Sequence, residues 1–207
     1  WGVSSMKLVC VIPAHLASVR FPKKILYKFH GIPMVEHVRR RALLSKSISR
    51  VIVATCDSEV ADLVISNGGE VVFTSNKHKN GTSRVAEAIS KIDCTHVILL
   101  QGDEPLLLPK HIDMMSNNIK RFPNIDSWNA IGSLENKNEL DKDSFVKCII
   151  TEKGKILYCF RRSPSHTSFS ENKKYIFKVL GIIAYKKDVL IELAKNSQTL
   201  IEKNESI

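Results

Sequence analysis

Apolar residues in the first half of the chain gather in short runs that are separated by polar turns. The runs lie at residues 7–12, 50–55, 70–74 and 97–100. Because apolar and polar positions do not alternate within them, they are typical of strands that a parallel sheet buries on both faces. Amphipathic helices are expected between and after them, beginning near Pro33, Asp57, Gly81 and Pro109. This order predicts a Rossmann-like parallel sheet with right-handed crossovers.

Polar residues at the helix starts supply candidate caps and a candidate anion site. Asp57 and Ser58 are expected to cap one helix, and Thr82 or Ser83 the next. Gly81 and Thr82 would also lie at a helix N-terminus, where backbone N–H groups attract an anion. This helix start is therefore either simply capped or part of a binding site.

The pattern changes after about Pro123. Two apolar runs, at 146–151 and 155–160, flank the segment 152–154 (EKG), which is the signal of a hairpin. Another strand is expected at 176–185, followed by a helix near Asp188. The second half is therefore predicted to be partly antiparallel.

The length of 207 residues fits one domain. We expect it to cover residues 6–207, with a regular half at 6–123 and a less regular half at 124–207. Residues 1–5 are interpreted as an extension that takes no part in the fold.

The strand at 97–100 ends in the polar turn 101–105 (QGDEP). Gly102 permits a tight turn, and Pro105 prevents the strand from continuing. Asp103 and Glu104 are thereby expected at the carboxyl end of a central strand, where open α/β sheets bind ligands. A solvated turn without a functional role is the alternative.

A second candidate is the loop at 14–24, which follows the first strand. It combines small residues and one hydroxyl with the cations Arg20, Lys23 and Lys24. This composition suits the wrapping of a phosphate chain, although it matches neither a Walker loop nor a GxGxxG turn. A basic surface loop is the alternative.

Composition narrows the class of protein. With 43% apolar and 25% charged residues, the chain is typical of a globular protein, and its apolar runs are too short for a membrane-spanning helix. The net charge of +10 is compatible with nucleic acid, an anionic membrane surface or small polyanions. Because the basic residues are scattered and no nucleic-acid-binding motif is present, we expect no nucleic-acid partner.

The sequence contains five cysteines. They show neither CxxC pairing nor metal-ligand spacing with histidine. Free thiols in a reducing cytosol are therefore expected.

Several short segments carry a resemblance to a known family. They are 11–15 (VIPAH), 18–26 (SVRFPKKIL), 31–38 (GIPMVEHV), 80–84 (NGTSR), 101–105 (QGDEP), 157–161 (LYCFR), 179–185 (VLGIIAY) and 200–207 (LIEKNESI). In this order they resemble the motifs of the 3-deoxy-manno-octulosonate cytidylyltransferase family, the CMP-Kdo synthetases. The resemblance covers nearly the whole chain, and the first-loop motif with QGDEP is specific to sugar-activating cytidylyltransferases.

The resemblance implies a three-layer α/β/α nucleotidyltransferase fold of the nucleotide-diphospho-sugar transferase type. A smaller, partly antiparallel region would form a homodimer. The implied activity is that of a cytoplasmic enzyme that converts CTP and Kdo into CMP-Kdo and diphosphate for lipopolysaccharide biosynthesis. The cofactor would be Mg²⁺, and the partners CTP and an acidic keto-deoxy sugar, with neither nucleic acid nor membrane.

The resemblance also implies roles for individual residues. Lys24, Arg20 and Asp103 would be catalytic, and Asp103 would hold the metal ion. The nucleotide would be bound by Pro13, Ala14, His15, Ser18, Arg20, Lys24, Gly81, Thr82 and Arg84. The sugar would be bound by Gln101, Arg161, Tyr185, Glu202 and Glu205. Elementary electrostatics agrees with such a set, because anionic substrates can approach one another only where cations neutralise them.

At some positions the sequence departs from the family pattern. His15 replaces an arginine, Cys56 and Ser83 replace acidic residues, and Val179 replaces a histidine of the sugar region. Val179 leaves a related sugar, such as 8-amino-Kdo or a nonulosonic acid, as an alternative substrate. A degenerate, non-catalytic nucleotide-binding homologue is the alternative from another class. The family's second metal carboxylate would follow Ile207, so we expect a chain truncated there to lack it.

Overall fold

The structure is a computed structural model that describes residues 5–17, 23–104, 107–163, 168–205 and 207. The chain forms two compact units. The first contains residues 1–128 and 181–196, and the second contains residues 129–180 and 197–207. No helix in the described part of the chain is both long and apolar enough to cross a membrane.

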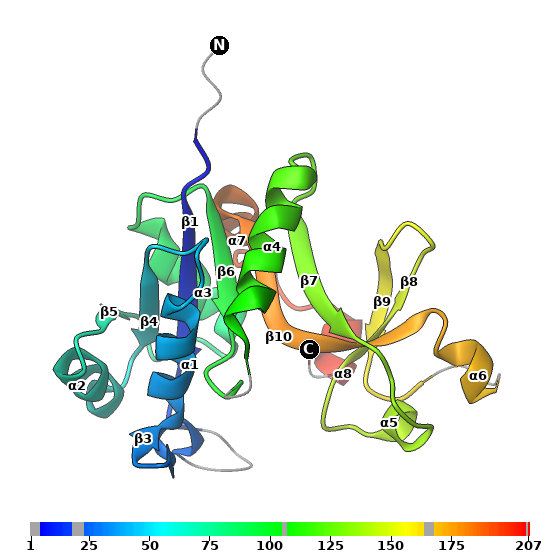
Figure 1. Cartoon of the computed structure of the whole chain (residues 1–207), viewed down its shortest axis with the longest axis horizontal. Helices are drawn as coiled ribbons and strands as arrows, with labels where there is room; N and C mark the ends of the chain where they lie inside the picture. The colour runs from blue at the N-terminus through cyan, green and yellow to red at the C-terminus, as the bar shows by residue number, and fades with distance from the viewer. Residues whose placement is uncertain (1–4, 18–22, 105–106, 164–167, 206) are drawn as a thin grey trace. The chain divides into compact units, whose positions relative to one another are not determined.

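The sheet of the first unit has the strand order β5-β4-β1-β6-β10 (Figure 1). The first four strands are parallel, and they are β1 (Leu8–Ala14), β4 (Val51–Thr55), β5 (Glu70–Phe73) and β6 (His96–Leu100). Residues 182–186 of β10 (Ile176–Lys186) run antiparallel to β6. The four predicted parallel strands are thus confirmed, and so is the strand predicted at 176–185.

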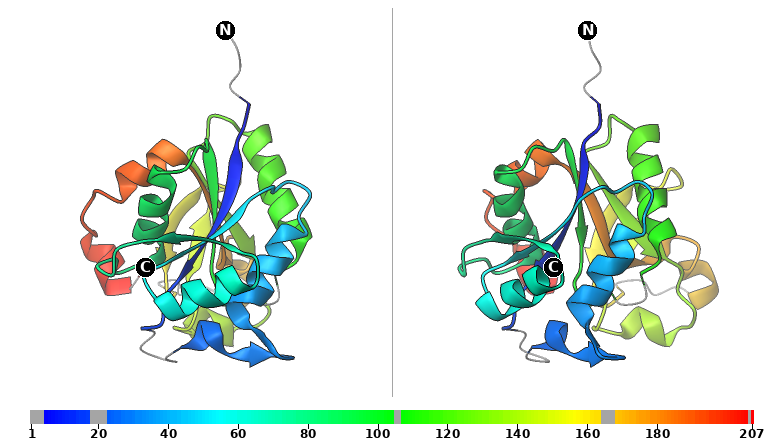
Figure 2. Two further views of the ribbon diagram at one scale, coloured as in Figure 1. Left: turned by 90° about the vertical axis from the view of Figure 1, so that its left-hand side faces the viewer. Right: turned by 60° about the vertical axis from the view of Figure 1, so that its left-hand side comes forward.

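Helices cover both faces of this sheet (Figure 2). On one face lie α3 (Gly81–Ser90) and α7 (Lys187–Leu193). On the other lie α1 (Met34–Leu43) and α4 (Pro109–Arg121). Helix α2 (Ser58–Ser66) packs against β4 and β5. The three-layer architecture that the family resemblance implies is therefore present.

The central strands are buried on both faces, as their unbroken apolar runs predict. Every residue of β1 is buried, and so are residues 97–100 of β6. Alternate residues of the two strands face α3, where Val9, Val11, Val97 and Leu99 join one apolar core cluster. Burial of this kind is the main stabilising contribution to such a sheet.

The helix caps differ from the prediction. At α3 the side chain of Asn80 accepts the backbone N–H of Ser83 at 2.8 Å, so neither Thr82 nor Ser83 is the cap. At α2 the N-cap residue is Asp57, but its side chain makes no capping bond. Its Oδ2 instead accepts the backbone N–H of Leu16 at 2.9 Å. A long-range contact thus replaces the local one.

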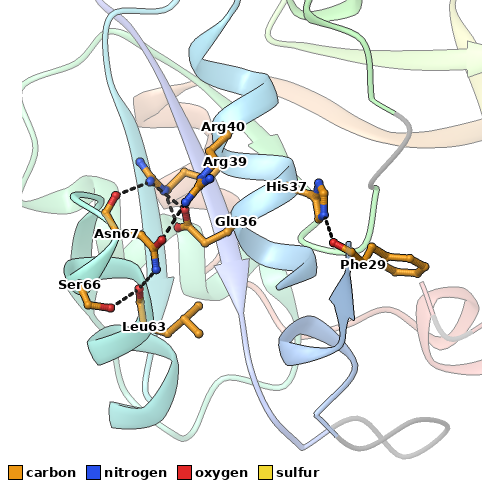
Figure 3. A network of polar contacts seen from close by, with 8 residues as sticks. All are labelled: Phe29, Glu36, His37, Arg39, Arg40, Leu63, Ser66 and Asn67. Atoms are coloured by element: carbon orange, nitrogen blue, oxygen red, sulfur yellow. Dashed lines mark hydrogen bonds and ion pairs between the residues drawn. The ribbon is translucent and has the colours of Figure 1, made fainter. Parts of the chain in front are cut away.

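Helix α1 carries a buried ionic network (Figure 3). The carboxylate of Glu36 is fully buried and accepts two hydrogen bonds from Arg39, at 2.6 and 2.9 Å, and one from Arg40 at 3.1 Å. Both arginines also bond Asn67 at the end of α2. Gly69 makes room for this network, because a Cβ there would lie 2.9 Å from Nε of Arg39.

Between β1 and α1 the chain forms two small elements that the sequence did not predict. They are the 3₁₀-helix η1 (Lys24–Leu26) and a two-stranded sheet of β2 (Lys28–Phe29) and β3 (Ile32–Pro33). Gly31 adopts φ 78° at the turn of this sheet, a value that favours glycine. The turn leads the chain from η1, which begins at Lys24, into α1.

The second unit is largely antiparallel. Strands β8 (Lys147–Ile150) and β9 (Ile156–Phe160) form the predicted hairpin, and β8 also pairs with residues 176–178 of β10. Strand β7 (Ser127–Gly132) pairs with β10 as well. The described residues of the unit also form the short helices α5 (Asn138–Asp141), α6 (Phe169–Asn172) and α8 (Leu200–Glu205). Its apolar core contains Leu134, Leu140, Phe160 and Ile176.

Candidate active site

A pocket of about 250 Å³ lies at the carboxyl ends of the parallel strands in the first unit. It is lined by Pro13, His15, Lys24, Ile25, His78, Lys79, Asn80, Gly81, Arg84, Gln101, Gly102 and Asp103. These residues come from the end of β1 and its loop, from the loop before α3, and from the turn after β6. The two loops predicted from sequence as candidate sites therefore lie together, at the edge of the sheet where α/β folds bind ligands.

Lys24 and Asp103 form an ion pair in this pocket. Lys24 lies in η1 and Asp103 in the turn after β6, and Nζ lies 2.9 Å from Oδ2. Both side chains are about two-fifths exposed, so the pair is hydrated and contributes at most about 1 kcal/mol to folding. A pair this weakly held can open when a phosphate competes for the ammonium group.

Arg84 is a buried cation that forms no ion pair with a carboxylate of the described residues. It is only 2% exposed, and its Nη1 donates to Oγ1 of Thr74 at 2.6 Å and to the carbonyl of Ser75 at 3.2 Å. Its Nη2 is buried and has no hydrogen-bond partner among the described residues. A buried donor without a partner is costly, so a hydrogen-bond acceptor that reached this Nη2 would stabilise it.

The loop before α3 is held by Glu87, a residue that sequence reasoning missed. The carboxylate of Glu87 accepts the N–H of Ser75 at 3.0 Å and contacts Nε2 of His78. The contact with His78, and to a smaller extent the hydrogen bond from Ser75, lower the pKa of Glu87 below its ordinary value. His78 and Lys79 thereby add two nitrogen groups to the pocket. Neither stands in a motif that marks them, so only the fold reveals them.

The turn after β6 is fixed against β10. The N–H of Gln101 donates to the carbonyl of Gly181 at 3.0 Å, and Glu104 packs on the same glycine. A Cβ on Gly181 would lie 2.7 Å from Oε1 of Glu104, closer than real contacts allow. Burial, and then the negative charge of Asp103, raise the pKa of Glu104. Glu104 is therefore a part of the turn and not a freely solvated acid.

The other residues predicted to bind nucleotide lie at the carboxyl end of β1, just after it, and at the start of α3. Pro13 and Ala14 are buried at the end of β1, and His15 follows them with an exposed side chain. Gly81 packs closely on Pro13, since a Cβ there would lie 3.0 Å from Cγ of the proline ring. Thr82 is half-buried in the first turn of α3 but does not line the pocket.

Two predicted residues lie outside the described part of the chain. They are Ser18 and Arg20, both in the first loop. Their predicted roles in binding the nucleotide and in catalysis stay predictions.

The residues predicted to bind sugar are distributed over both units. Gln101 lines the pocket of the first unit, whereas Tyr185 packs on the apolar core beside α3 and α7. In the second unit, Arg161 is bound to Glu205. The backbone N–H of Arg161 donates to Oε2 of Glu205 at 2.7 Å, and its side-chain Nε donates to the backbone carbonyl of Glu205 at 2.6 Å. Glu202 accepts the N–H of Thr199 at 2.6 Å, at the start of α8. Arg161 and Glu205 thus form one cluster.

Three comparisons relate this chain to known proteins. A family model described as cytidylyltransferase matches residues 9–207. The 3-deoxy-manno-octulosonate cytidylyltransferase of Geobacter sulfurreducens is 33% identical, over 98% of this chain and 85% of that protein. The protein of the same name from Thermodesulfovibrio yellowstonii is 36% identical, over 98% of this chain and 84% of its own length.

Solved structures resemble the chain in the same way. A CMP:2-keto-3-deoxy-manno-octonic acid synthetase complexed with CTP matches with a TM-score of 0.88 and 33% identity, over 97% of this chain and 83% of that one. A 4-diphosphocytidyl-2C-methyl-D-erythritol synthase from Anaerococcus prevotii matches with a TM-score of 0.61 and 10% identity. The second likeness concerns the fold alone.

Proposed function

Because the chain belongs to the cytidylyltransferase family and is thus a nucleotidyltransferase, we propose that its substrates are CTP and 3-deoxy-manno-octulosonate (Kdo). The anomeric oxygen of the sugar attacks the α-phosphorus of CTP. The bond from that phosphorus to the oxygen bridging to the β-phosphate breaks, diphosphate leaves, and the hydroxyl proton passes to solvent. The products are CMP-Kdo and diphosphate. The relatives of this name, and the one solved with CTP, support these substrates.

The observation that carries the proposal is the buried guanidinium of Arg84. Arg84 lines the pocket, and its buried Nη2 has no hydrogen-bond partner among the described residues. The pocket also contains Lys79 and Lys24, and Lys24 is paired only weakly, with Asp103. A polyanion such as the triphosphate of CTP would satisfy both Arg84 and Lys24. Their charges would then neutralise the repulsion between the phosphates and the incoming anionic sugar, which is the main barrier that such an enzyme must lower.

We propose Mg²⁺ as the cofactor, because phosphoryl transfer needs positive charge at the phosphates and the pocket contains the carboxylate of Asp103 as an oxygen ligand. Asp103 supplies an accessible hard oxygen, and Mg²⁺ in nucleotide sites takes one or two carboxylates together with phosphate oxygens and water. When bound, the ion would supply positive charge that polarises the phosphates. Lys24, released from Asp103, would then hold a phosphate oxygen. Both residues thereby orient the α-phosphorus for in-line attack.

On the sugar side, Gln101, which lines the pocket of the first unit, would contact a hydroxyl of the sugar. A related sugar, such as 8-amino-Kdo or a nonulosonic acid, is the second candidate substrate. It is favoured by Val179, which stands in β10 where the resembling motif has a histidine, and whose N–H donates to the carbonyl of Val146. A valine offers no hydrogen bond from its side chain, so this position would recognise the sugar differently.

Diphosphate release tests the proposal. The full-length protein is incubated with CTP, Mg²⁺ and, in separate reactions, Kdo, 8-amino-Kdo and a nonulosonic acid. We expect release with Kdo and little with the others. Release with another acidic sugar but not with Kdo would overturn the substrate. Binding of CTP without turnover of any sugar would favour the non-catalytic homologue instead.

We further propose that the enzyme is a cytoplasmic homodimer that supplies CMP-Kdo for lipopolysaccharide biosynthesis. All five cysteines are free thiols in the structure, which suits a reducing compartment. Light scattering on the purified full-length protein would measure its mass, and a monomer at micromolar concentration would contradict the dimer.

A further inference from the structure

Two residues at which the sequence departs from the family motif, His15 and Cys56, lie side by side. They directly follow the paired ends of two neighbouring parallel strands, since Ala14 of β1 is in register with Thr55 of β4. Adjacent strands lie about 4.8 Å apart, so the next residue of each strand is brought close to the other. Because His15 and Cys56 are far apart in the sequence, the spacing of cysteines and histidines along the chain did not indicate a metal site here.

Asp57 completes a group of three potential ligands. The imidazole of His15, the thiol of Cys56 and the carboxylate of Asp57 have ligand atoms that all lie within 4.8 Å of one another. The Nδ1 atom of His15 is 3.7 Å from Oδ2 of Asp57. For metal–ligand bonds of 2.0–2.3 Å, a tetrahedral ion requires ligand atoms about 3.3–3.8 Å apart. Only small side-chain rotations are therefore needed.

The group is also held in place and accessible. The N–H of Leu16 donates to Oδ2 of Asp57 at 2.9 Å, which ties the loop after β1 to the start of α2 and orients the carboxylate. Such supporting hydrogen bonds are typical of metal ligands. His15 is exposed, and Cys56 and Asp57 are half-buried, so an ion could reach all three.

We propose that His15, Cys56 and Asp57 bind a Zn²⁺ ion, with the fourth position open to water. A nitrogen, a thiolate and one carboxylate form a ligand set typical of Zn²⁺, whereas Mg²⁺ prefers oxygen alone. The site is thus distinct in its chemistry from the Mg²⁺ position proposed at Asp103. Because His15 also lines the pocket, the ion would fix this side chain and the loop after β1 against α2. The inference goes beyond the proposed activity and does not depend on it.

Metal binding by the full-length, reduced protein tests the site without any measurement of turnover. Zn²⁺ is titrated against a chromophoric chelator, and Co²⁺ is then substituted to record the thiolate-to-cobalt charge-transfer band. We expect one ion per chain and a clear band. Cys56→Ser should abolish the band and weaken Zn²⁺ binding by at least about tenfold, because loss of even a supporting residue costs 10- to 100-fold. Asp57→Asn and His15→Gln should weaken Zn²⁺ binding as well.

Two matched variants control for unrelated ligands. Cys159 is half-buried like Cys56, and His30 is exposed like His15. Cys159→Ser and His30→Gln should leave both the affinity and the band unchanged. Circular dichroism would check that each variant is folded. Wild-type protein that binds no stoichiometric Zn²⁺, or a folded Cys56→Ser variant that keeps the band, would overturn the proposal.

Discussion

Lys24 and Asp103 are 79 positions apart in the sequence, yet the ammonium nitrogen of one lies 2.9 Å from a carboxylate oxygen of the other. The two groups proposed to hold a phosphate and Mg²⁺ therefore neutralise each other in the free protein. Since both are partly exposed, their separation costs little free energy. In the proposed function, substrate and Mg²⁺ would draw these two opposite charges apart.

The first prediction concerns this pair. Lys24→Ala should reduce the rate of diphosphate release by about 100- to 1000-fold, because it removes a charge that stabilises the transition state. Asp103→Ala should abolish release. Neither change should lower the melting temperature much, since an exposed pair contributes little to stability. Steady-state kinetics and thermal melts measure the two effects.

The neighbouring residue Lys23 provides the control. Its Nζ lies 2.8 Å from Oε2 of Glu59, and both side chains are more than half exposed. Lys23→Ala removes the same charge from the surface but should leave the rate of diphosphate release nearly unchanged. Equal losses in the two lysine variants would mean that net charge, and not the position of Lys24, controls activity.

The second prediction concerns Arg84. Arg84→Met keeps the length of the side chain but removes an uncompensated buried charge, so the protein should be at least as stable as the wild type. Its affinity for CTP should nevertheless fall by at least about tenfold, because charged hydrogen bonds are worth about 1.5–3 kcal/mol. Calorimetric titration with CTP and a denaturant melt check both parts. A destabilised variant that binds CTP normally would contradict a role in binding.

The third prediction is a pH dependence that involves Glu104. Burial, with Asp103 next to it, raises the pKa of this carboxyl in the folded state. Between the ordinary pKa, about 4.5, and the raised one, the folded state holds more protons than the unfolded state. Stability therefore falls as pH rises through this range. The isosteric variant Glu104→Gln should melt at a higher temperature than wild type near pH 7.

This advantage of Glu104→Gln should shrink as pH falls and vanish below about pH 4.5, where the carboxyl is protonated in both states. Thermal melts of the two proteins between about pH 4 and 8 measure it. Glu152→Gln, in the exposed turn between β8 and β9, is a suitable control. A gain that stays constant over the whole range would exclude this carboxyl as its source.

The fourth prediction concerns the network on α1 (Figure 3). Glu36→Ala leaves Arg39 buried without its carboxylate and should cost about 3–5 kcal/mol in the free energy of unfolding. The double variant Glu36→Leu with Arg39→Met should lose less, because no buried charge remains unpaired. Removing the exposed partner through Arg40→Ala should cost no more than about 1 kcal/mol. Urea denaturation gives all three values.

Much of the fold could be predicted because periodicity and burial act locally. The unbroken runs in β1 and β6 predicted strands buried on both faces, and the turn after β6 predicted a ligand site at their carboxyl ends. The hairpin of β8 and β9 followed from its turn residues, with Gly154 at φ 78°. Each of these features depends on residues that are close in sequence.

What the sequence could not predict depends on contacts between distant segments. Asp57 was expected to cap α2, but the loop after β1 offers it the N–H of Leu16 instead. A solvated turn was the alternative for Glu104, yet the absence of a side chain at Gly181 lets Glu104 pack against β10. No periodicity or spacing reports such contacts, because they arise only when strands far apart in the chain become neighbours.

The pairing of β1 with β6 has a consequence for how the protein reaches its native state. Lys7, just before β1, hydrogen-bonds Thr95 across 88 positions, and β1 pairs with β6, which carries the turn that contains Asp103. Topologies dominated by such long-range contacts fold slowly. A nascent or partly folded chain would therefore lack the assembled pocket in which the triphosphate is proposed to bind. A column that carries an immobilised nucleotide should therefore retain natively folded molecules and let partly folded ones pass.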